Sequence, residues 1–305
     1  MKEIKTVGII GLGALGTLYA HLLTKGFGRE RVLVLADASR TKRYREDGIW
    51  FNNQLCDFQY VDAAEAAGPL DLLLFAVKFG GLESAIASCR HLIGPETTLV
   101  SVLNGISSEQ ILSDAFSPEQ VVWCVAQKMS ARKEGNRILV NPLGELAIGI
   151  PSEYPSAHFE RLTAFFDSID FPYSVPEDIR VHMWSKLLCN TGCNQANMVF
   201  ECNYGGLQFP GKARDTMIGA MHEVVTVANA EGIPLSNKDV DIWVSLIDGF
   251  PPEGETSMRQ DGKAHRKSEV ELFSGTIRRI AQKHGIAVPV NDWLYETIQK
   301  MESAY

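Results

Sequence analysis

Cysteine is sparse in this chain, and its spacing suits neither a disulfide scaffold nor a metal site. The 305 residues include six cysteines, and no two of them form a C-x-x-C pair. Cys189 and Cys193 lie one helical turn apart, but no histidine stands near them at a ligand spacing. We therefore expect free thiols, a cytoplasmic location and no metal site.

The chain also lacks a membrane-spanning run and an excess of positive charge. Residues 70–77 form the most apolar stretch, but it contains Asp71 and is far shorter than the roughly 20 residues needed to cross a bilayer. The net charge is −8 and the basic residues are scattered among acids, which argues against a nucleic-acid partner. With 45% hydrophobic and 22% charged residues, the composition is that of an ordinary globular protein, long enough for two domains.

A glycine motif near the N-terminus indicates a dinucleotide site. Residues 4–10 predict a buried strand, residues 17–25 have helical character, and Gly11-Leu12-Gly13-Ala14-Leu15-Gly16 lies between them. In such a motif the first glycine permits a tight turn, the second lets the backbone approach a pyrophosphate, and the third lets helix and strand pack closely. The alternative is an ordinary glycine-rich turn between a strand and a helix.

The end of the second expected strand, residues 31–36, gives two opposed signals about the cofactor. Asp37 lies about 20 residues after Gly16, where an acid binds ribose hydroxyls and favours NAD. The next segment contains Arg40, Lys42 and Arg43, and a nearby arginine favours NADP. These residues leave the choice between the two cofactors open.

Further apolar runs complete a mainly parallel sheet. Residues 71–77, 97–103 and 121–126 predict strands, residues 138–150 a further pair, and residues 49–61 a small hairpin that turns at Asn52-Asn53. Lys78 and Asn104 follow two of these strands, where ligands bind in such sheets, although lysines and Asn-Gly turns are also common at strand ends. After an amphipathic stretch at 154–169 and an extended one at 171–175, helices predominate. We expect domains at 1–175 and 176–305.

A polar stripe marks the first long helix of the second domain, expected over residues 179–201. Lys186, Asn190 and Asn194 recur every four residues, beside apolar Trp184 and Leu187. Burial would lower the pKa of the lysine and make it a usable proton donor. The alternative is a solvated lysine with asparagines that bond only to nearby backbone.

Two further candidates lie near the C-terminus. Ser257 follows a Pro-Pro-Glu-Gly loop, where a serine commonly caps a helix. Glu269 lies in an expected helix over residues 266–284, where an acid is most simply a solvated charge. Other expected helices cover residues 211–231, 238–246 and 292–303.

Taken together, these motifs resemble the ketopantoate reductase (2-dehydropantoate 2-reductase) family along the full length of the chain. The matching motifs are Gly11-x-Gly13-x-x-Gly16, Val77-Lys78, Asn104-Gly105, Trp184-x-Lys186-Leu187-x-x-Asn190-x-x-x-Asn194, Ser257-Met258-x-x-Asp261, and Ser268-Glu269 followed by Gly275. The resemblance implies an α/β fold: a Rossmann-type parallel-sheet domain followed by an all-α domain like that of 6-phosphogluconate dehydrogenase, with substrate in the cleft between them.

The resemblance also implies a role for each matching residue. Lys186 corresponds to the general acid that protonates the ketone oxygen, and Glu269 to an acid at the edge of the cofactor and active site. The implied substrate contacts are Asn104, Asn190, Asn194 and Ser257. The expected cofactor contacts are Gly11, Leu12, Gly13, Ala14, Leu15, Gly16, Asp37, Arg40, Lys78, Asn104 and Glu269.

The sequence departs from the family pattern at two places. The family often has an arginine near position 37 that grips a 2′-phosphate, and here the residue is Asp37. After Asn194, the polar run Gln195-Ala196-Asn197 replaces a more usual apolar, small-residue continuation. The first departure bears on the cofactor and the second on the substrate.

We therefore expect an NADP-dependent reduction of 2-dehydropantoate (ketopantoate) to (R)-pantoate, on the route to pantothenate and coenzyme A. NAD is the alternative cofactor because of Asp37. Two other functions remain: a related 2-keto or 3-hydroxy acid dehydrogenase on the same scaffold, or a non-catalytic regulator that binds a nicotinamide nucleotide. The expected partner is a small keto acid, with neither nucleic acid nor membrane. A homodimer is left open, since the sequence shows no self-association face.

Overall fold

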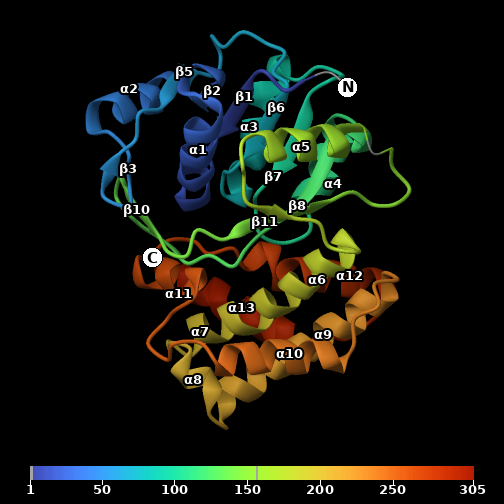
Figure 1. Ribbon diagram of the computed structural model, residues 1–305. Coiled ribbons are helices and arrows are strands. Elements are labelled where there is room, and N and C mark those ends of the chain that lie inside the picture. Colours follow the sequence, from blue (N-terminus) through green and yellow to red (C-terminus); the bar gives the residue numbers. More distant parts are fainter. Residues whose placement is uncertain (1–2, 156) are drawn as a thin grey trace. The chain divides into compact units, whose positions relative to one another are not determined.

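The computed structural model describes residues 3–155 and 157–305, and contacts between them divide the chain into two compact units. The first, called here the sheet unit, runs to Asn104 and continues over Ser108–Ile179. The second, the helical unit, comprises Gly105–Ser107 and Arg180–Tyr305 (Figure 1). A parallel-sheet domain followed by a helical one is the fold predicted from the sequence, and that prediction is confirmed.

An eight-stranded sheet forms the centre of the sheet unit. Neighbouring strands pair in parallel except β8 and β11, which are antiparallel. The order across the sheet is β12 (Tyr173–Ser174), β11 (Glu145–Gly149), β8 (Val121–Gln127), β7 (Thr98–Ser101), β6 (Leu72–Phe75), β1 (Val7–Ile10), β2 (Val32–Ala36) and β5 (Gln59–Asp62).

Helices cover both faces of this sheet because its central strands are apolar on both sides. Val7 and Ile9 belong to a core cluster with α1 (Ala14–Phe27) and α5 (Ala157–Ser168). Ile10 belongs to a second cluster with α3 (Leu82–Cys89) and α4 (Ser108–Ala115), on the other face. α2 (Ala38–Asp47) packs beside β2 and β5. Of the expected amphipathic segment 154–169, Ser156 lies outside the described residues.

A second, four-stranded sheet differs from the sequence-based expectation. Its order is β4 (Gln54–Leu55), β3 (Trp50–Phe51), β10 (Arg137–Val140) and β9 (Ala131–Glu134). The expected hairpin over residues 49–61 is confined to β3 and β4, turning at Asn52 and Asn53 with φ of 46° and 67°, whereas β5 joins the main sheet. The pair expected at 138–150 is split, with β10 in the second sheet and β11 in the main one. Strand β9 was not predicted.

The acid in the apolar run, Asp71, is explained by a buried ion pair. Its Oδ1 lies 2.8 Å from Nη2 of Arg161 on α5, and its Oδ2 accepts from the backbone nitrogens of Lys5 and Thr6. The pair therefore ties α5 to the starts of β1 and β6. Because each charge has hydrogen-bonding partners, it can be buried at this position.

The helical unit is built around one interrupted helix. α6 (Ile179–Cys189) continues through a π-helical turn, Asn190–Asn194, into α7 (Gln195–Val199). The remaining helices are α8 (Gly205–Gln208), α9 (Lys212–Ala230), α10 (Asn237–Asp248), α11 (Ser257–Lys263), α12 (Ser274–His284) and α13 (Pro289–Glu302). The single helix expected over 266–284 is wrong, since its first residues are irregular. Among the described helices, none combines the length and apolarity that a bilayer crossing requires.

Candidate active site

The glycine turn, residues 11–16, joins β1 to α1, and its geometry accounts for each glycine. Gly11 has a φ of +100°, and a Cβ there would lie 2.7 Å from the carbonyl oxygen of Ala76. A Cβ at Gly16 would lie 1.9 Å from the carbonyl oxygen of Gly11, so only glycine lets α1 start this close to the strand. At Gly13 the described atom nearest to a Cβ is the Ala76 oxygen, 3.9 Å away. The turn therefore fits a pyrophosphate at the start of α1.

The predicted cofactor residues of the sheet unit share one edge of the main sheet. Asp37 directly follows β2, and Lys78 and Asn104 lie just beyond the ends of β6 and β7. Since β2, β1, β6 and β7 are parallel neighbours, these residues and the glycine turn lie at the same carboxyl edge. The strand order reverses between β1 and β6, where ligands bind in open α/β sheets. Lys78 is exposed and Asn104 half-buried.

Asp37 and Arg40, which gave opposed signals about the cofactor, form one ion pair. Asp37 is the N-cap of α2, and its Oδ1 accepts a 2.8 Å hydrogen bond from the backbone nitrogen of Arg40. Its Oδ2 lies 3.4 Å from Nε of Arg40, and both side chains are 60% exposed. The helix start thus fixes the carboxylate at the end of β2, and the arginine is directed to that carboxylate.

In the helical unit, Lys186 lies half-buried near the end of α6, and Asn190 and Asn194 are the first and last residues of the π turn. In an α-helix a four-residue spacing exceeds one turn of 3.6 residues, so the three side chains would drift around the helix. A π turn has i→i+5 hydrogen bonds and holds roughly one residue more per turn. Asn194 therefore turns back toward the line of Lys186 and Asn190, and the stripe is straighter than the sequence alone predicted.

The two amides in this stripe are buried. Asn190 is 8% exposed and Asn194 9% exposed. Within the described part of the chain, no protein group hydrogen-bonds to either side-chain amide. Because buried polar groups are nearly always paired, the two amides are suited to a polar ligand. Burial raises the pKa of the adjacent Cys189 thiol to about 12, despite the charge of Lys186, so this thiol stays neutral.

Two residues that sequence reasoning did not assign to the site hold the π turn in place. A Cβ at Gly192 would lie 2.6 Å from Cγ of Met221, so only glycine lets α9 pack this closely. Gln195 is fully buried, and its Nε2 donates a 2.6 Å hydrogen bond to the carbonyl oxygen of Thr191. Its Oε1 accepts a 3.4 Å bond from the backbone nitrogen of Ser274. Gln195, where the sequence departs from the family pattern, thus stabilises the π turn.

Ser257 lies at the start of α11 with an exposed side chain. The expected capping role is wrong, because the cap is Thr256, whose Oγ1 accepts a 3.4 Å hydrogen bond from the backbone nitrogen of Arg259. The Ser257 hydroxyl is therefore not used as a helix cap. α11 contacts both the π turn and α7, so Ser257 lies on a helix packed against the segment that carries the two amides.

Glu269 lies outside any helix, immediately before a 3₁₀ turn, Val270–Leu272. The hydroxyl of the preceding Ser268 accepts a 3.3 Å bond from the backbone nitrogen of Val270, and the Ser268 nitrogen donates to Oε1 of Glu302 at 2.8 Å. Glu269 itself is half-buried. Glu269 was expected to be a surface charge on a helix. It lies instead on an irregular segment that is hydrogen-bonded to α13.

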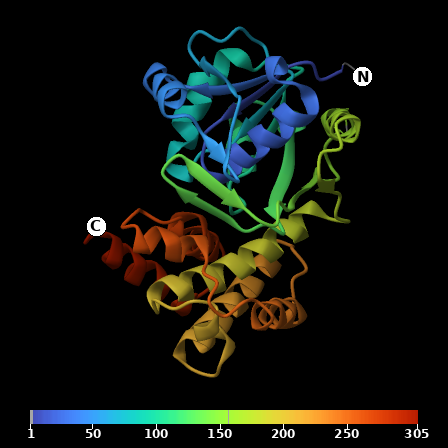
Figure 2. The ribbon, with the colours of Figure 1, turned by 60° about the vertical axis from the view of Figure 1, so that its left-hand side comes forward.

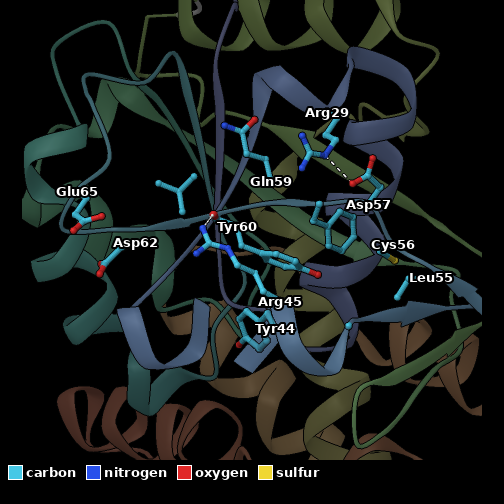
Figure 3. Close-up of a pocket in the computed structure, with 13 residues that line it drawn as sticks. Arg29, Tyr44, Arg45, Leu55, Cys56, Asp57, Gln59, Tyr60, Asp62 and Glu65 are labelled. Atoms are coloured by element: carbon cyan, nitrogen blue, oxygen red, sulfur yellow. Dashed lines mark hydrogen bonds and ion pairs between the residues drawn. The ribbon is translucent and has the colours of Figure 1, made fainter. Parts of the chain in front are cut away.

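A groove of about 610 Å³ follows the outer edge of the main sheet along β5 (Figure 3). Charges of both signs line it, including Arg29 paired with Asp57 at 2.8 Å. The guanidinium of Arg45 donates a 2.8 Å hydrogen bond to the carbonyl oxygen of Tyr60 on β5. Such a contact blunts an open strand edge, and the groove contains none of the predicted site residues.

Comparison with protein families follows the division into two units. The family model "Ketopantoate reductase PanE/ApbA" matches residues 7–153, and "Ketopantoate reductase PanE/ApbA C terminal" matches residues 178–302. The chain belongs to this family. The resemblance inferred from the motifs is therefore confirmed, and the protein is an NAD(P)-dependent oxidoreductase of the PanE/ApbA family.

Relatives match the chain over nearly its full length. The chain is 23% identical over 300 residues to the 2-dehydropantoate 2-reductase of Aquifex aeolicus, covering 96% of each protein. It is 29% identical to that of Mycobacterium tuberculosis, covering 94% of the chain and 95% of the relative. Among solved structures, a D-mandelate dehydrogenase with NADH has a TM-score of 0.87 at 22% identity, covering 98% of this chain and 99% of that one. The similarity to this solved structure establishes the fold.

Proposed function

We propose that this PanE/ApbA family protein reduces 2-dehydropantoate to pantoate with a reduced nicotinamide dinucleotide. The observation that carries the proposal is the π turn, which holds two buried amides on the same helix as Lys186. Among the described residues, no protein group hydrogen-bonds to these amides. Ketopantoate has a carbonyl, a hydroxyl and a carboxylate, and amides bind neutral oxygens without adding charge. The relatives named 2-dehydropantoate 2-reductase support the same assignment.

In this proposal each site residue has one task. When bound, the nicotinamide supplies a hydride to the ketone carbon. The ammonium of Lys186 gives a proton to the ketone oxygen as negative charge develops there, which yields the product hydroxyl. Asn190 and Asn194 hold the substrate's neutral oxygens, and the Ser257 hydroxyl donates to its carboxylate. The predicted roles of Asn104 and Glu269 as contacts at the substrate and cofactor stay part of the proposal.

For the cofactor, we propose NADH in preference to the NADPH expected at first from the family resemblance. A carboxylate at Asp37 binds the adenosine ribose hydroxyls and repels a 2′-phosphate. Arg40, a neighbouring cation that could offset this repulsion, is paired with Asp37 at 3.4 Å. The carboxylate is also fixed as the N-cap of α2, so it does not swing away freely.

A steady-state assay with purified protein tests the proposal. We expect ketopantoate reduction with NADH to exceed that with NADPH in kcat/KM, and benzoylformate, the keto acid of mandelate, to be a poor substrate. Faster turnover of benzoylformate would favour the second candidate, a related 2-keto acid dehydrogenase like the structurally similar D-mandelate dehydrogenase. Cofactor binding with no turnover of any keto acid would instead support a nucleotide-binding regulator.

A further inference from the structure

The second sheet brings a cation to the glycine turn. Nζ of Lys133 on β9 donates a 2.8 Å hydrogen bond to the carbonyl oxygen of Leu12, between the first two glycines of the motif. The lysine is distant from the turn in sequence and belongs to none of the motifs singled out above. An ammonium has three N–H donors and can bind several oxygens at once.

The sheet that carries Lys133 is anchored on α1, the helix that the glycine turn begins (Figure 2). Lys133 pairs in register with Ile138 of β10, which is fully buried in the core beneath it. Phe51 of β3 stacks on His21 of α1, with 4.5 Å between ring centroids. The position of the Lys133 backbone relative to the turn is therefore set by packed elements of the same unit.

The start of α1 is suited to an anion. Gly13, its N-cap, makes no side-chain capping bond, and the first turn contains no acidic residue. The first N–H groups of a helix lack intrahelical partners and carry a partial positive charge. A lysine beside this end adds a full positive charge at the same place. An oligophosphate bound at the turn would be stabilised both by the partial positive charge of the helix end and by the charge of the lysine.

We propose that Lys133 is a phosphate ligand of the dinucleotide, holding the Leu12 carbonyl and a pyrophosphate oxygen together. The hydrogen bond to Leu12 positions the ammonium at the turn, and the second contact neutralises one phosphate charge. The chemical class recognised is a nucleoside diphosphate, whatever group is attached to its second phosphate. The inference rests on the dinucleotide cofactor of the family and is independent of which keto acid is reduced.

Binding measurements without substrate test this role. Dissociation constants for NADH, ADP-ribose and adenosine would be measured by calorimetry or competition for wild type, Lys133→Met and Lys133→Arg. We expect Lys133→Met to weaken NADH and ADP-ribose by the same factor, about tenfold, because a charge-assisted contact to phosphate is lost. Adenosine, which lacks phosphate, should bind as before. Lys133→Arg should stay within about threefold of wild type, and added salt should reduce the Lys133→Met effect by screening.

The neighbouring residue provides a matched control. Arg132 is also exposed on β9, but its side chain points to the other face of the strand and pairs with Glu134 at 2.8 Å. Arg132→Met should leave all three dissociation constants unchanged. Unchanged ADP-ribose binding by Lys133→Met would overturn the proposal, as would an equal loss for adenosine, which would indicate a distorted turn. Because no keto acid enters the assay, such a failure would leave the proposed reaction untouched.

Discussion

The side-chain amide of Gln195 donates a 2.6 Å hydrogen bond to the carbonyl of Thr191, inside the π turn that carries Asn190 and Asn194. Gln195 faces the protein core, where it also accepts from the backbone of Ser274 at the start of α12. The amide therefore connects the turn to α12 without itself being placed among the proposed substrate contacts. π turns occur frequently at functional sites, where the extra residue redirects side chains.

Replacing Gln195 with Leu should separate substrate binding from cofactor binding. The change removes both hydrogen bonds, so we expect a loss of about 1–3 kcal/mol in the free energy of unfolding. We also expect the π turn to loosen and Asn194 to lose its position beside Lys186 and Asn190. The KM for the keto acid should then rise about tenfold, which corresponds to the loss of one good polar contact. The dissociation constant for NADH should not change. Denaturation, steady-state kinetics and calorimetry measure the three quantities.

Gln208→Leu is the control for a loss of stability alone. The Gln208 amide joins α8 to the end of α10 through the carbonyls of Ile247 and Phe250, at 2.9 and 2.8 Å. We expect this variant to lose stability with KM unchanged. If both variants raised KM alike, Gln195 would have only a general structural role.

Lys186→Met should abolish most of the turnover while the protein still binds NADH. Methionine keeps much of the apolar stem but cannot donate a proton, and loss of a general acid typically lowers kcat by about 10²–10⁴-fold. Rapid single-turnover measurements with ketopantoate check this, beside a Lys238→Met control on the exposed face of α10. A variant that kept a near-normal rate would rule out Lys186 as the proton donor.

Asp37→Asn should reduce the discrimination against NADPH. Asparagine caps helices about as well as aspartate, so α2 and the melting temperature should be preserved while the negative charge is removed. We expect the ratio of kcat/KM values, NADH over NADPH, to fall about tenfold, mainly through a lower KM for NADPH. Glu46→Gln near the end of α2, where Glu46 pairs with Lys42 at 3.8 Å, is the matched loss of one charge. An unchanged ratio in Asp37→Asn would remove Asp37 from cofactor selection.

The sheet unit was largely predictable because its signals are local. Continuous apolar runs identified β1, β6, β7 and β8, and the glycine spacing identified the turn, whose close contacts at Gly11 and Gly16 only glycine can satisfy. The second sheet was missed in part because β9, Ala131–Glu134, is mostly charged and exposed. The sequence of such a strand cannot be distinguished from that of an exposed loop. No local pattern therefore indicated that Lys133 hydrogen-bonds to the carbonyl of Leu12.

The π turn shows a different limit of sequence reasoning. Residues 179–201 have continuous helical character, and the step from i→i+4 to i→i+5 bonding leaves no mark on hydrophobic periodicity. Tertiary and local contacts favour the π turn: α9 packs against Gly192, and the side chain of Gln195 donates a hydrogen bond to the carbonyl of Thr191. The irregular residues before α12 have a similar origin, since Glu302 of α13 binds the backbone of Ser268. Spacing predicted which residues share a face, and packing determined how well they align.

The last prediction concerns Glu109, a buried acid at the start of α4. Its Oε2 accepts a 3.0 Å hydrogen bond from Ser108, whose hydroxyl in turn accepts from Ser101 at 2.8 Å. Only 1% of the residue is exposed, and burial raises its pKa from 4.5 to about 8. At pH values between about 4.5 and 8, the Glu109 carboxyl keeps its proton in the folded protein, whereas in the unfolded chain the same carboxyl has lost it. The free energy of unfolding should therefore fall as pH rises from about 4.5 to 8, and level off above that.

Glu109→Gln should remove this dependence, because the amide mimics the neutral carboxyl at every pH. We expect the variant to match wild type near pH 4.5 and to become more stable than it by about 1–3 kcal/mol at pH 8. Urea denaturation at several pH values measures the difference, with Glu119→Gln on the adjacent exposed turn as the control. Stability curves for wild type and Glu109→Gln that stay parallel from pH 4.5 to 8 would show that the carboxyl is already ionised in the folded protein. In that case the carboxylate would need a compensating partner, because an isolated buried charge is too costly to persist.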